Sequence, residues 1–422
     1  MRTMRRWSSC RLGPAAIALA TLLVASSVAR AQGAGAGSTQ DGPTLTIRGI
    51  LSGTMFVQDA LFGLGNGQQA LFVAQEVDEI WHGADVRSMR LGLDLAGPQV
   101  MPGWRVNATV EGDFFGPFAA AGNFGDEQPT PRLRLAYADL TNGRTTLRVG
   151  QDWSLTLGNL PVSTSHVGFI LGWSSGGVIG WRFPGISLRH RMTETGAPMN
   201  ATLAVAVMRG SWVDEAVSDG PSAGEAGSPQ LEARLDLDGR TAAGHAWGTY
   251  LVGHWDRKDL GGLAPNENPV GDANLESWAV QGGARLSGPR FTLHGNAYTG
   301  VAMAHQFGQI LQFGDIAGWG AWAQGGVNLT PRWSLWLYAG TEQPDEDDVR
   351  AAGGTRLSSL TLTPMLRFAA GPYSLGLEWM RSDVDYVAGA GSTGLVGNQY
   401  LLSARYDFSM RFAPLAPAGA AR

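Results

Sequence analysis

Seven arginines between positions 90 and 191 are spaced so that they could bind anions. They are Arg90, Arg132, Arg134, Arg148, Arg182, Arg189 and Arg191. Each stands in a short segment where polar and apolar residues alternate, so the arginines share the polar face. A guanidinium keeps its charge and offers a planar fork of N–H donors that matches carboxylates and phosphates. Such a row along one wall of a channel would favour anions.

Acidic residues at similar positions leave a second role open. Asp94, Glu111 and Asp113 fall on the same polar faces, and could pair with the arginines and only stiffen the wall. Further inward acids are expected elsewhere, at Glu232, Asp236 and Glu378.

A loop without acids follows the first arginines. Ser154–Gly176 (SLTLGNLPVSTSHVGFILGWSSG) holds no Asp or Glu. It would be the third long loop of a barrel with a central lumen. If it folds into that lumen, Ser154, Ser163 and His166 belong to a constriction in which the arginines set the electrostatic field. His166 could titrate near neutrality, or serve only as a hydrogen-bonding residue.

Motifs for catalysis or metal binding lack their structural context. Gly172–Gly176 matches G-x-S-x-G without a helix after it, and Gly389–Gly394 matches G-x-G-x-x-G without a strand–helix setting. The seven histidines show no zinc-binding spacing. We expect no catalytic residues, no metal and no cofactor. An outer-membrane lipase would need a lipid-facing His–Ser pair, whereas His254 is expected to face the lumen.

Alternation with a period of two predicts the elements that carry these residues. Segments of about ten residues, separated by Gly, Pro, Asn and Asp, are typical of a transmembrane antiparallel β-barrel. Sixteen strands are expected, in the regions 44–57, 89–95, 104–114, 132–140, 146–153, 177–192, 200–208, 229–238, 246–257, 275–286, 291–300, 318–329, 332–342, 357–369, 373–384 and 398–408.

The phase of the alternation changes once, within residues 177–192. Arg182 faces inward with the even positions, whereas Arg189 and Arg191 face inward with the odd ones. Either a tight hairpin or one strand with a bulge at Pro184 explains this change. The bulge is preferred because it leaves an even number of strands.

The links between strands alternate in length, as in bacterial barrels. One set is short, including Asn142-Gly143 and Gly371-Pro372. The other is long and is expected outside the cell, at 58–86, 116–131, 154–176, 209–228, 258–274, 301–317, 343–356 and 385–397. The acidic run Asp345–Asp348 in one long link could bridge to lipopolysaccharide through divalent cations, or be a solvated loop.

Aromatic residues at the strand ends indicate the two membrane interfaces. Expected outward aromatics are Trp247, Phe291, Trp333, Phe368, Tyr373 and Phe408 near the short turns, and Trp153, Trp278 and Trp319 near the long loops. The last strand ends at Phe408 or Phe412.

The N-terminus indicates export. Arginines precede the apolar run Ala15–Val24, and Ala29–Ala31 offers a small-x-small cleavage site, so residues 1–31 are a predicted signal peptide. Residues 32–43 are a short flexible lead-in, 44–412 the barrel and 413–422 a tail. Cys10 lies in the signal, so no disulfide is expected. Beyond residue 31 the chain has 26 basic and 36 acidic residues, a formal charge of −10, which argues against nucleic acid as a partner.

Four sequence blocks resemble the DcaP-like bacterial outer-membrane porins. They are Asp85–Gly97, Glu111–Gly116, Pro131–Leu140 and Val149–Leu155. The resemblance is best over 85–193 and further along rests on strand rhythm. It implies a sixteen-stranded homotrimeric channel for small, often anionic solutes such as dicarboxylates. The N-terminal coiled coil of some members is not expected, because 32–43 is too short and glycine-rich.

The sequence therefore predicts an all-β outer-membrane porin, a passive channel for small hydrophilic solutes, with lipid and lipopolysaccharide around it. The arginine-lined constriction would favour anions such as carboxylates. A lipase-like barrel enzyme and a structural barrel without an open pore stay as alternatives.

Overall fold

The computed structural model describes residues 43–116, 129–210, 223–262, 268 and 273–412. The predicted signal peptide (1–31), nearly all of the lead-in (32–43) and the tail (413–422) lie outside the described residues. Within the described ranges, no helix is long and apolar enough to cross a membrane.

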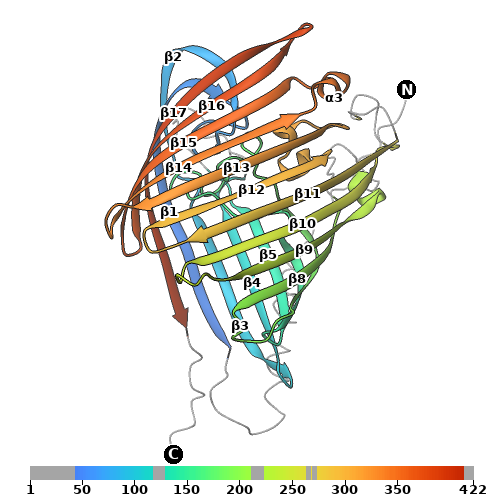
Figure 1. Cartoon of the computed structure of the whole chain (residues 1–422), viewed down its shortest axis with the longest axis vertical. Helices are drawn as coiled ribbons and strands as arrows, with labels where there is room; N and C mark the ends of the chain where they lie inside the picture. Colours follow the sequence, from blue (N-terminus) through green and yellow to red (C-terminus); the bar gives the residue numbers. More distant parts are fainter. Residues whose placement is uncertain (1–42, 117–128, 211–222, 263–267, 269–272, 413–422) are drawn as a thin grey trace, which may run out of the picture. The chain divides into compact units, whose positions relative to one another are not determined.

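Seventeen antiparallel strands form one closed sheet, the predicted β-barrel (Figure 1). Because residues of opposite polarity alternate, each strand turns one face inward and one outward. The strands are β1 (Thr44–Phe62), β2 (Val73–Asp85), β3 (Arg90–Met101), β4 (Trp104–Asp113), β5 (Arg132–Thr141), β6 (Thr145–Trp153), β7 (Arg182–Arg191), β8 (Met199–Met208), β9 (Ser228–Arg240), β10 (Ala246–Asp259), β11 (Asn274–Ser287), β12 (Phe291–Val301), β13 (Ala317–Asn328), β14 (Trp333–Pro344), β15 (Arg356–Ala370), β16 (Tyr373–Ala388) and β17 (Gly391–Phe412).

The sixteen predicted positions around the barrel are confirmed, with one strand more than expected. Both β2 and β3 pair with β1: β3 lies beside residues 44–50 and β2 beside residues 54–62. The two strands therefore share one position around the barrel, interrupted at residues 86–89. The predicted loop at 58–86 was wrong, since β1 extends to Phe62 and β2 follows it.

The first and last strands close the barrel. β1 pairs with β17 from Leu45 opposite Phe412 to Gln58 opposite Gln399. The last strand therefore ends at Phe412 rather than Phe408.

The preferred bulge at Pro184 was wrong. β7 is one strand, and its register against β6 runs without a shift from Arg182 to His190. The change of phase falls instead at Arg182 and Phe183, which are both buried. Alternation is not imposed there, because the chain is only then entering the sheet from the preceding loop.

The lengths of the connections differ between the two ends of the barrel, as predicted. Short turns join the strands at one end, among them residues 142–144, 288–290 and 371–372. The other end carries the longer connections at 154–181, 302–316 and 345–355. The long loop expected at 385–397 was wrong, because β16 and β17 continue to a turn at Gly389 and Ala390.

In the described residues, short helical segments occur only in the connections between strands. They are the 3-10 turns η2 (Gly67–Gln69), η4 (Ala304–Gln306) and η5 (Gln309–Leu311) and the helices α2 (Ala223–Ala226) and α3 (Glu346–Ala351). The Asp345 carboxylate caps α3 by accepting from the backbone N–H groups of Asp347 and Asp348. The predicted acidic run is therefore partly a helix start.

The outer face is apolar, as an environment of lipid requires. Leucine, valine and aromatic side chains at alternate positions are exposed, including Trp278, Trp319, Trp333 and Tyr373. Trp153 is an exception to the predicted aromatic belts. Its ring lies in the lumen, 6.0 Å from the ring of Trp173.

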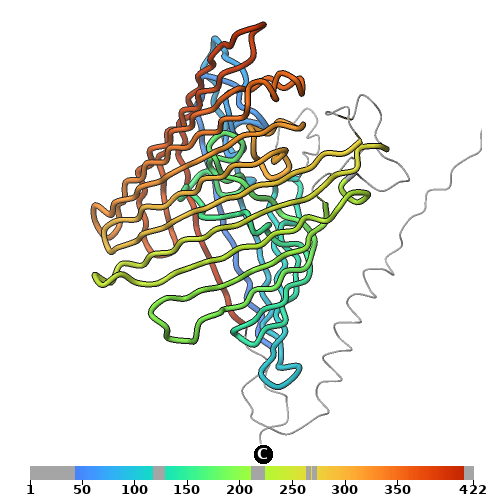
Figure 2. The backbone as a smooth tube through the Cα atoms, turned by 45° about the vertical axis from the view of Figure 1, so that its right-hand side comes forward, coloured from blue at the N-terminus to red at the C-terminus, as the bar shows by residue number. Residues whose placement is uncertain are grey.

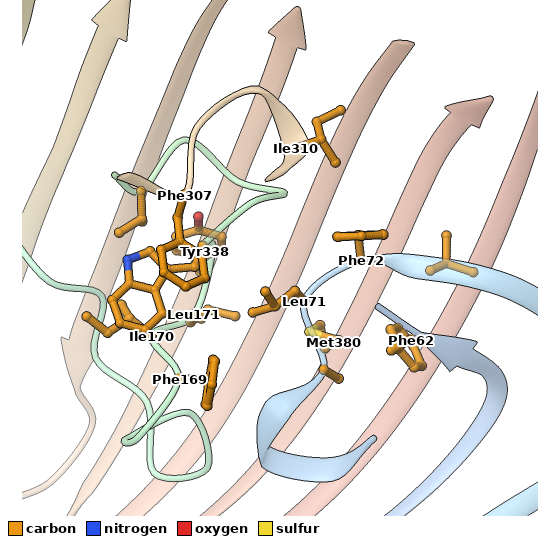
Figure 3. Packing of buried hydrophobic residues seen from close by; sticks show 14 of the residues in the cluster. Phe62, Leu71, Phe72, Phe169, Ile170, Leu171, Phe307, Ile310, Tyr338 and Met380 are labelled. Atoms are coloured by element: carbon orange, nitrogen blue, oxygen red, sulfur yellow. The ribbon is translucent and has the colours of Figure 1, made fainter. Parts of the chain in front are cut away.

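Three connections fold inward and pack together inside the barrel (Figure 2). They are the β1–β2 loop (63–72), the β6–β7 loop (154–181) and the β12–β13 loop (302–316). Figure 3 shows Leu71 and Phe72, Phe169–Leu171, and Phe307 with Ile310 converging from these loops onto the inner wall. Burial of these side chains fixes the loops within the lumen. The predicted inward fold of the third long loop is thus confirmed.

Candidate functional site

Two of the predicted arginines share two carboxylates on the inner wall of β4. Arg132 Nη2 lies 2.7 Å from Asp113 Oδ2. Arg134 contacts the same oxygen at 2.7 Å through Nη1, and Glu111 Oε1 at 2.9 Å through Nε. All four side chains come from the neighbouring strands β4 and β5, whose register sets Arg132 directly opposite Asp113.

Arg48 and Arg90 extend this arrangement onto β1 and β3. Arg48 Nε lies 2.7 Å from Asp94, and its Nη1 lies 2.6 Å from Glu111. Arg90 Nε approaches Glu111 at 3.6 Å, and Arg90 Nη2 donates to the carbonyl of Val167 at 2.7 Å. We call this set the arginine–carboxylate network: Arg48, Arg90, Arg132, Arg134, Asp94, Glu111 and Asp113. Its four guanidinium groups and three carboxylates leave one net positive charge.

Arg182 stands beside this network without an acid of its own. Its side chain is 6% exposed, and no hydrogen bond or ion pair of its guanidinium occurs in the described residues. The guanidinium carbon lies 4.2 Å from the ring centre of Trp181 and 4.8 Å from that of Trp153. Cation–π attraction therefore stabilises this buried charge in place of a carboxylate.

The other predicted arginines lie apart from the network. Arg148 contacts Asp139 at 2.7 Å and Asp152 at 2.6 Å. Arg189 has no ion pair within the described ranges and lies in electrostatic range of Arg148. Arg191 donates to Thr195 at 3.1 Å, at the short-turn end of the barrel. The alternation thus placed the arginines on the inner face, but the structure divides them into two groups.

Four further lumenal arginines were not among the predicted pore-lining residues, namely Arg48, Arg234, Arg367 and Arg405. Arg234 pairs with Asp236 at 2.8 Å and Arg405 with Asp407 at 2.7 Å. The same period-two alternation that selected Arg132 places Arg367 and Arg405 on the inner faces of β15 and β17. The array of lumenal arginines therefore continues past β1 to β15.

The tip of the β6–β7 loop is fixed to the wall by Glu378 of β16. Glu378 Oε1 accepts from the backbone N–H of Thr164 at 2.7 Å, from the Thr164 hydroxyl at 2.6 Å and from the N–H of Ser165 at 2.8 Å. Its Oε2 accepts from the Ser163 hydroxyl at 2.7 Å. Glu378 is 1% exposed, so its carboxylate interacts with the loop and is not accessible from the lumen.

The predicted loop residues Ser154, Ser163 and His166 occupy different places. Ser154 is buried at the root of the loop, where its hydroxyl lies 2.6 Å from that of Thr156. Ser163 lies at the tip, on Glu378. His166 is buried, and neither ring nitrogen has a hydrogen-bond partner within the described residues. Burial lowers the pKa of His166 below its ordinary value of 6.5, against the opposing attraction of the Glu378 carboxylate.

Two further lumenal glutamates also hold loop backbone. Glu342 Oε2 accepts from the N–H of Ile310 at 2.6 Å, in the β12–β13 loop. Glu232 accepts from the N–H of Leu155 and from His254 Nδ1. Both carboxylates are buried. His254 thus faces the lumen, as predicted.

The motifs that resemble enzyme signatures fall in unsuitable places. Gly172–Gly176 lies in the β6–β7 loop, and Gly389–Gly394 spans the turn between β16 and β17. In the part of the chain that the structure describes, no group of three His, Cys, Asp or Glu could hold a metal ion.

No family model matches the sequence, and no curated protein matches it. Among solved structures, the chain is similar to the outer membrane channel DcaP of Acinetobacter baumannii, with a TM-score of 0.63 and 17% identity over 89% of this chain and 100% of that one. An anion-selective porin from Comamonas acidovorans has a TM-score of 0.54 and 13% identity, over 87% and 100%. OmpT, an outer membrane protein of Vibrio cholerae in a trimer form, has a TM-score of 0.52 and 11% identity, over 87% and 100%. The fold is that of the outer-membrane porins, and the resemblance to DcaP is confirmed at this level.

Proposed function

We propose that this barrel is an outer-membrane porin, a passive diffusion channel for small hydrophilic solutes that favours anions such as carboxylates. The signal peptide, residues 1–31, would direct export and then be cleaved off. No energy source and no cofactor are needed, because solutes move down their own gradients. No residue is assigned a catalytic role.

The proposed preference for anions rests on a difference in exposure between three lumenal glutamates and two lumenal arginines. Glu232, Glu342 and Glu378 are buried and accept hydrogen bonds from loop backbone. By contrast, Arg48 keeps 34% and Arg132 20% of its side chain exposed. Because Asp94, beside Arg48, is itself 35% exposed, the preference also rests on the one net positive charge of the arginine–carboxylate network and on Arg182, which would make the field in the lumen positive although the chain as a whole is negative.

The local field decides which ions enter a narrow path, since low-dielectric walls concentrate it. Arg182 lies within electrostatic range of Arg132, Arg134 and Arg90. These guanidinium groups can replace part of the water around a carboxylate with N–H donors. A cation would meet the same groups as a barrier.

The assembly and its surroundings belong to the same proposal. A homotrimer is inferred from the resemblance to DcaP-like porins. The apolar outer face would contact lipid. The acidic α3 region would bind lipopolysaccharide through divalent cations. Nucleic acid is not a proposed partner.

A barrel without an open pore is the second candidate, favoured by the apolar cluster inside the lumen. The residues of Figure 3 fill space that an open channel would leave to water. A lipase-like enzyme is not favoured, because His254 points inward between Glu232 and Asp256.

Solute uptake into liposomes separates the two candidates. Purified protein that migrates faster unheated than boiled on a denaturing gel is folded and is used for reconstitution. We expect swelling in a small dicarboxylate to be faster than in a neutral solute of matched size. No swelling in any solute would support the closed barrel, and equal swelling in both solutes would refute the anion preference.

A further inference from the structure

The inner wall beside the tip of the β6–β7 loop carries a second group of polar side chains, away from the arginine–carboxylate network. Arg367 of β15 lies directly opposite Gly376 of β16. Thr164 at the loop tip lies on Gly376, so closely that a Cβ at that position would overlap its hydroxyl. Arg367 therefore flanks the point where the loop meets the wall.

Two groups at this place have no partner. The Arg367 Nε atom is buried and makes no hydrogen bond, and no ion pair of Arg367 occurs in the described residues. The Ser374 hydroxyl, on a side chain that is 2% exposed, also has none. Ser374 is two residues from Gly376 on the same inner face. Buried donors without partners are rare in folded proteins, and a bound anion would satisfy both of these.

The charged groups around Arg367 are Arg405, Asp407 and Glu378. Arg405 of β17 lies directly opposite Ser374, and Arg367 is within its electrostatic range. The Arg405 guanidinium already binds Asp407, and Glu378 is engaged by the loop tip. Arg367 thus holds the one guanidinium of this group without a carboxylate.

We propose that Arg367 and Ser374 form a binding site for a single oxyanion group, a carboxylate or a phosphate, on the inner wall beside the tip of the β6–β7 loop. This assignment rests on the proposed porin function and names the residues that determine its specificity there. Arg367 offers a planar fork and Ser374 a hydroxyl donor, and together they fit two oxygens of one such group.

Planar-bilayer recording of single variants tests the site. Arg367→Ala and Ser374→Ala remove the two donors, and Arg367→Lys keeps the charge without the fork. Arg381→Ala is the matched control, because Arg381 lies on the outer face of β16, where it pairs with Asp383. Each variant is first shown to be folded by its faster migration when unheated.

We expect Arg367→Ala to lower the chloride-to-potassium permeability ratio by about fivefold, which corresponds to the ~1 kcal/mol of one charge at 4 Å in water. Block of the chloride current by inorganic phosphate should weaken in Arg367→Ala and in Ser374→Ala. Arg367→Lys should keep the permeability ratio and lose most of the phosphate block. Arg381→Ala should match the wild type in both measurements.

The outcomes separate this inference from the function on which it rests. An anion-selective wild type with an unchanged Arg367→Ala variant would overturn the binding site and leave the porin function standing. A cation-selective wild type whose phosphate block still depends on Arg367 would overturn the anion preference and leave the binding site standing. Phosphate block that is the same in all variants would overturn the site in either case.

Discussion

Glu378 fixes the tip of the β6–β7 loop, and its replacement by alanine should release that tip. The carboxylate accepts four hydrogen bonds from three consecutive loop residues, Ser163, Thr164 and Ser165. Two of the four donors are backbone N–H groups, and the N–H of Ser165 also donates to the Ser163 hydroxyl at 3.1 Å. In Glu378→Ala the N–H of Thr164 would be left unpaired in a buried place.

The size of the effect follows from that one group. A buried donor left without a partner costs about 1–3 kcal/mol, so binding of the loop tip to the wall is weakened by roughly that amount. Since 1.4 kcal/mol is a factor of ten, the equilibrium shifts toward the released loop by roughly fivefold or more. The barrel itself should persist, because its strands pair independently of this side chain.

Single-channel recording detects the release. We expect Glu378→Ala to conduct with larger and noisier currents than the wild type, while its gel mobility still shows a folded barrel. Glu276→Ala is the matched control, because Glu276 lies on the outer face of β11 and accepts from the Trp255 indole. Wild-type conductance and noise in Glu378→Ala would refute the argument that this carboxylate positions the loop.

Three further outcomes are expected. The pKa of His166 lies below 6.5 while the loop tip is bound to the wall, and it has its ordinary value when the tip is released. Binding of the tip to the wall is therefore stabilised above pH 6.5 and weakened as the pH falls. Current noise of the wild type should rise between pH 6.5 and 5, and His166→Gln should abolish that rise; identical pH profiles would contradict this. Gly376→Val should displace Thr164 and raise the conductance as Glu378→Ala does, and a wild-type current would count against the contact. An epitope inserted at Asp347 should be reached by antibody on intact cells and one at Asn142-Gly143 should not, whereas the reverse pattern would invert the proposed orientation.

Alternation of polar and apolar residues predicted the barrel because every strand in lipid must separate its two faces. It failed where that separation is not needed. β2 (VAQEVDEIWHGAD) is exposed on both faces over most of its length, so no period of two marks it. The far ends of β16 and β17 are similar, and their sequence looked like a loop.

The candidate site was predictable only in part for a related reason. Alternation assigns Arg132 and Arg134 to the inner face, but it does not predict their positions along the barrel axis. Whether Asp113 or another acid meets them depends on the register between β4 and β5. The role of Glu378 was beyond sequence reasoning, because its loop partners lie 213 to 215 residues away.

The bulge expected at Pro184 illustrates a third limit. The sequence assigned Arg182 and Arg189 to the inside despite their opposite phase. Alternation alone could not tell whether the chain adjusts within a strand or before it, and the structure shows the adjustment at the first residue of β7.

The zero-current potential of the wild-type channel in a potassium chloride gradient tests the central claim most directly. Buried glutamates and accessible arginines should give a potential with the sign of the chloride equilibrium potential. A potential with the sign of the potassium equilibrium potential would contradict the proposal that the arginines set the field in the lumen.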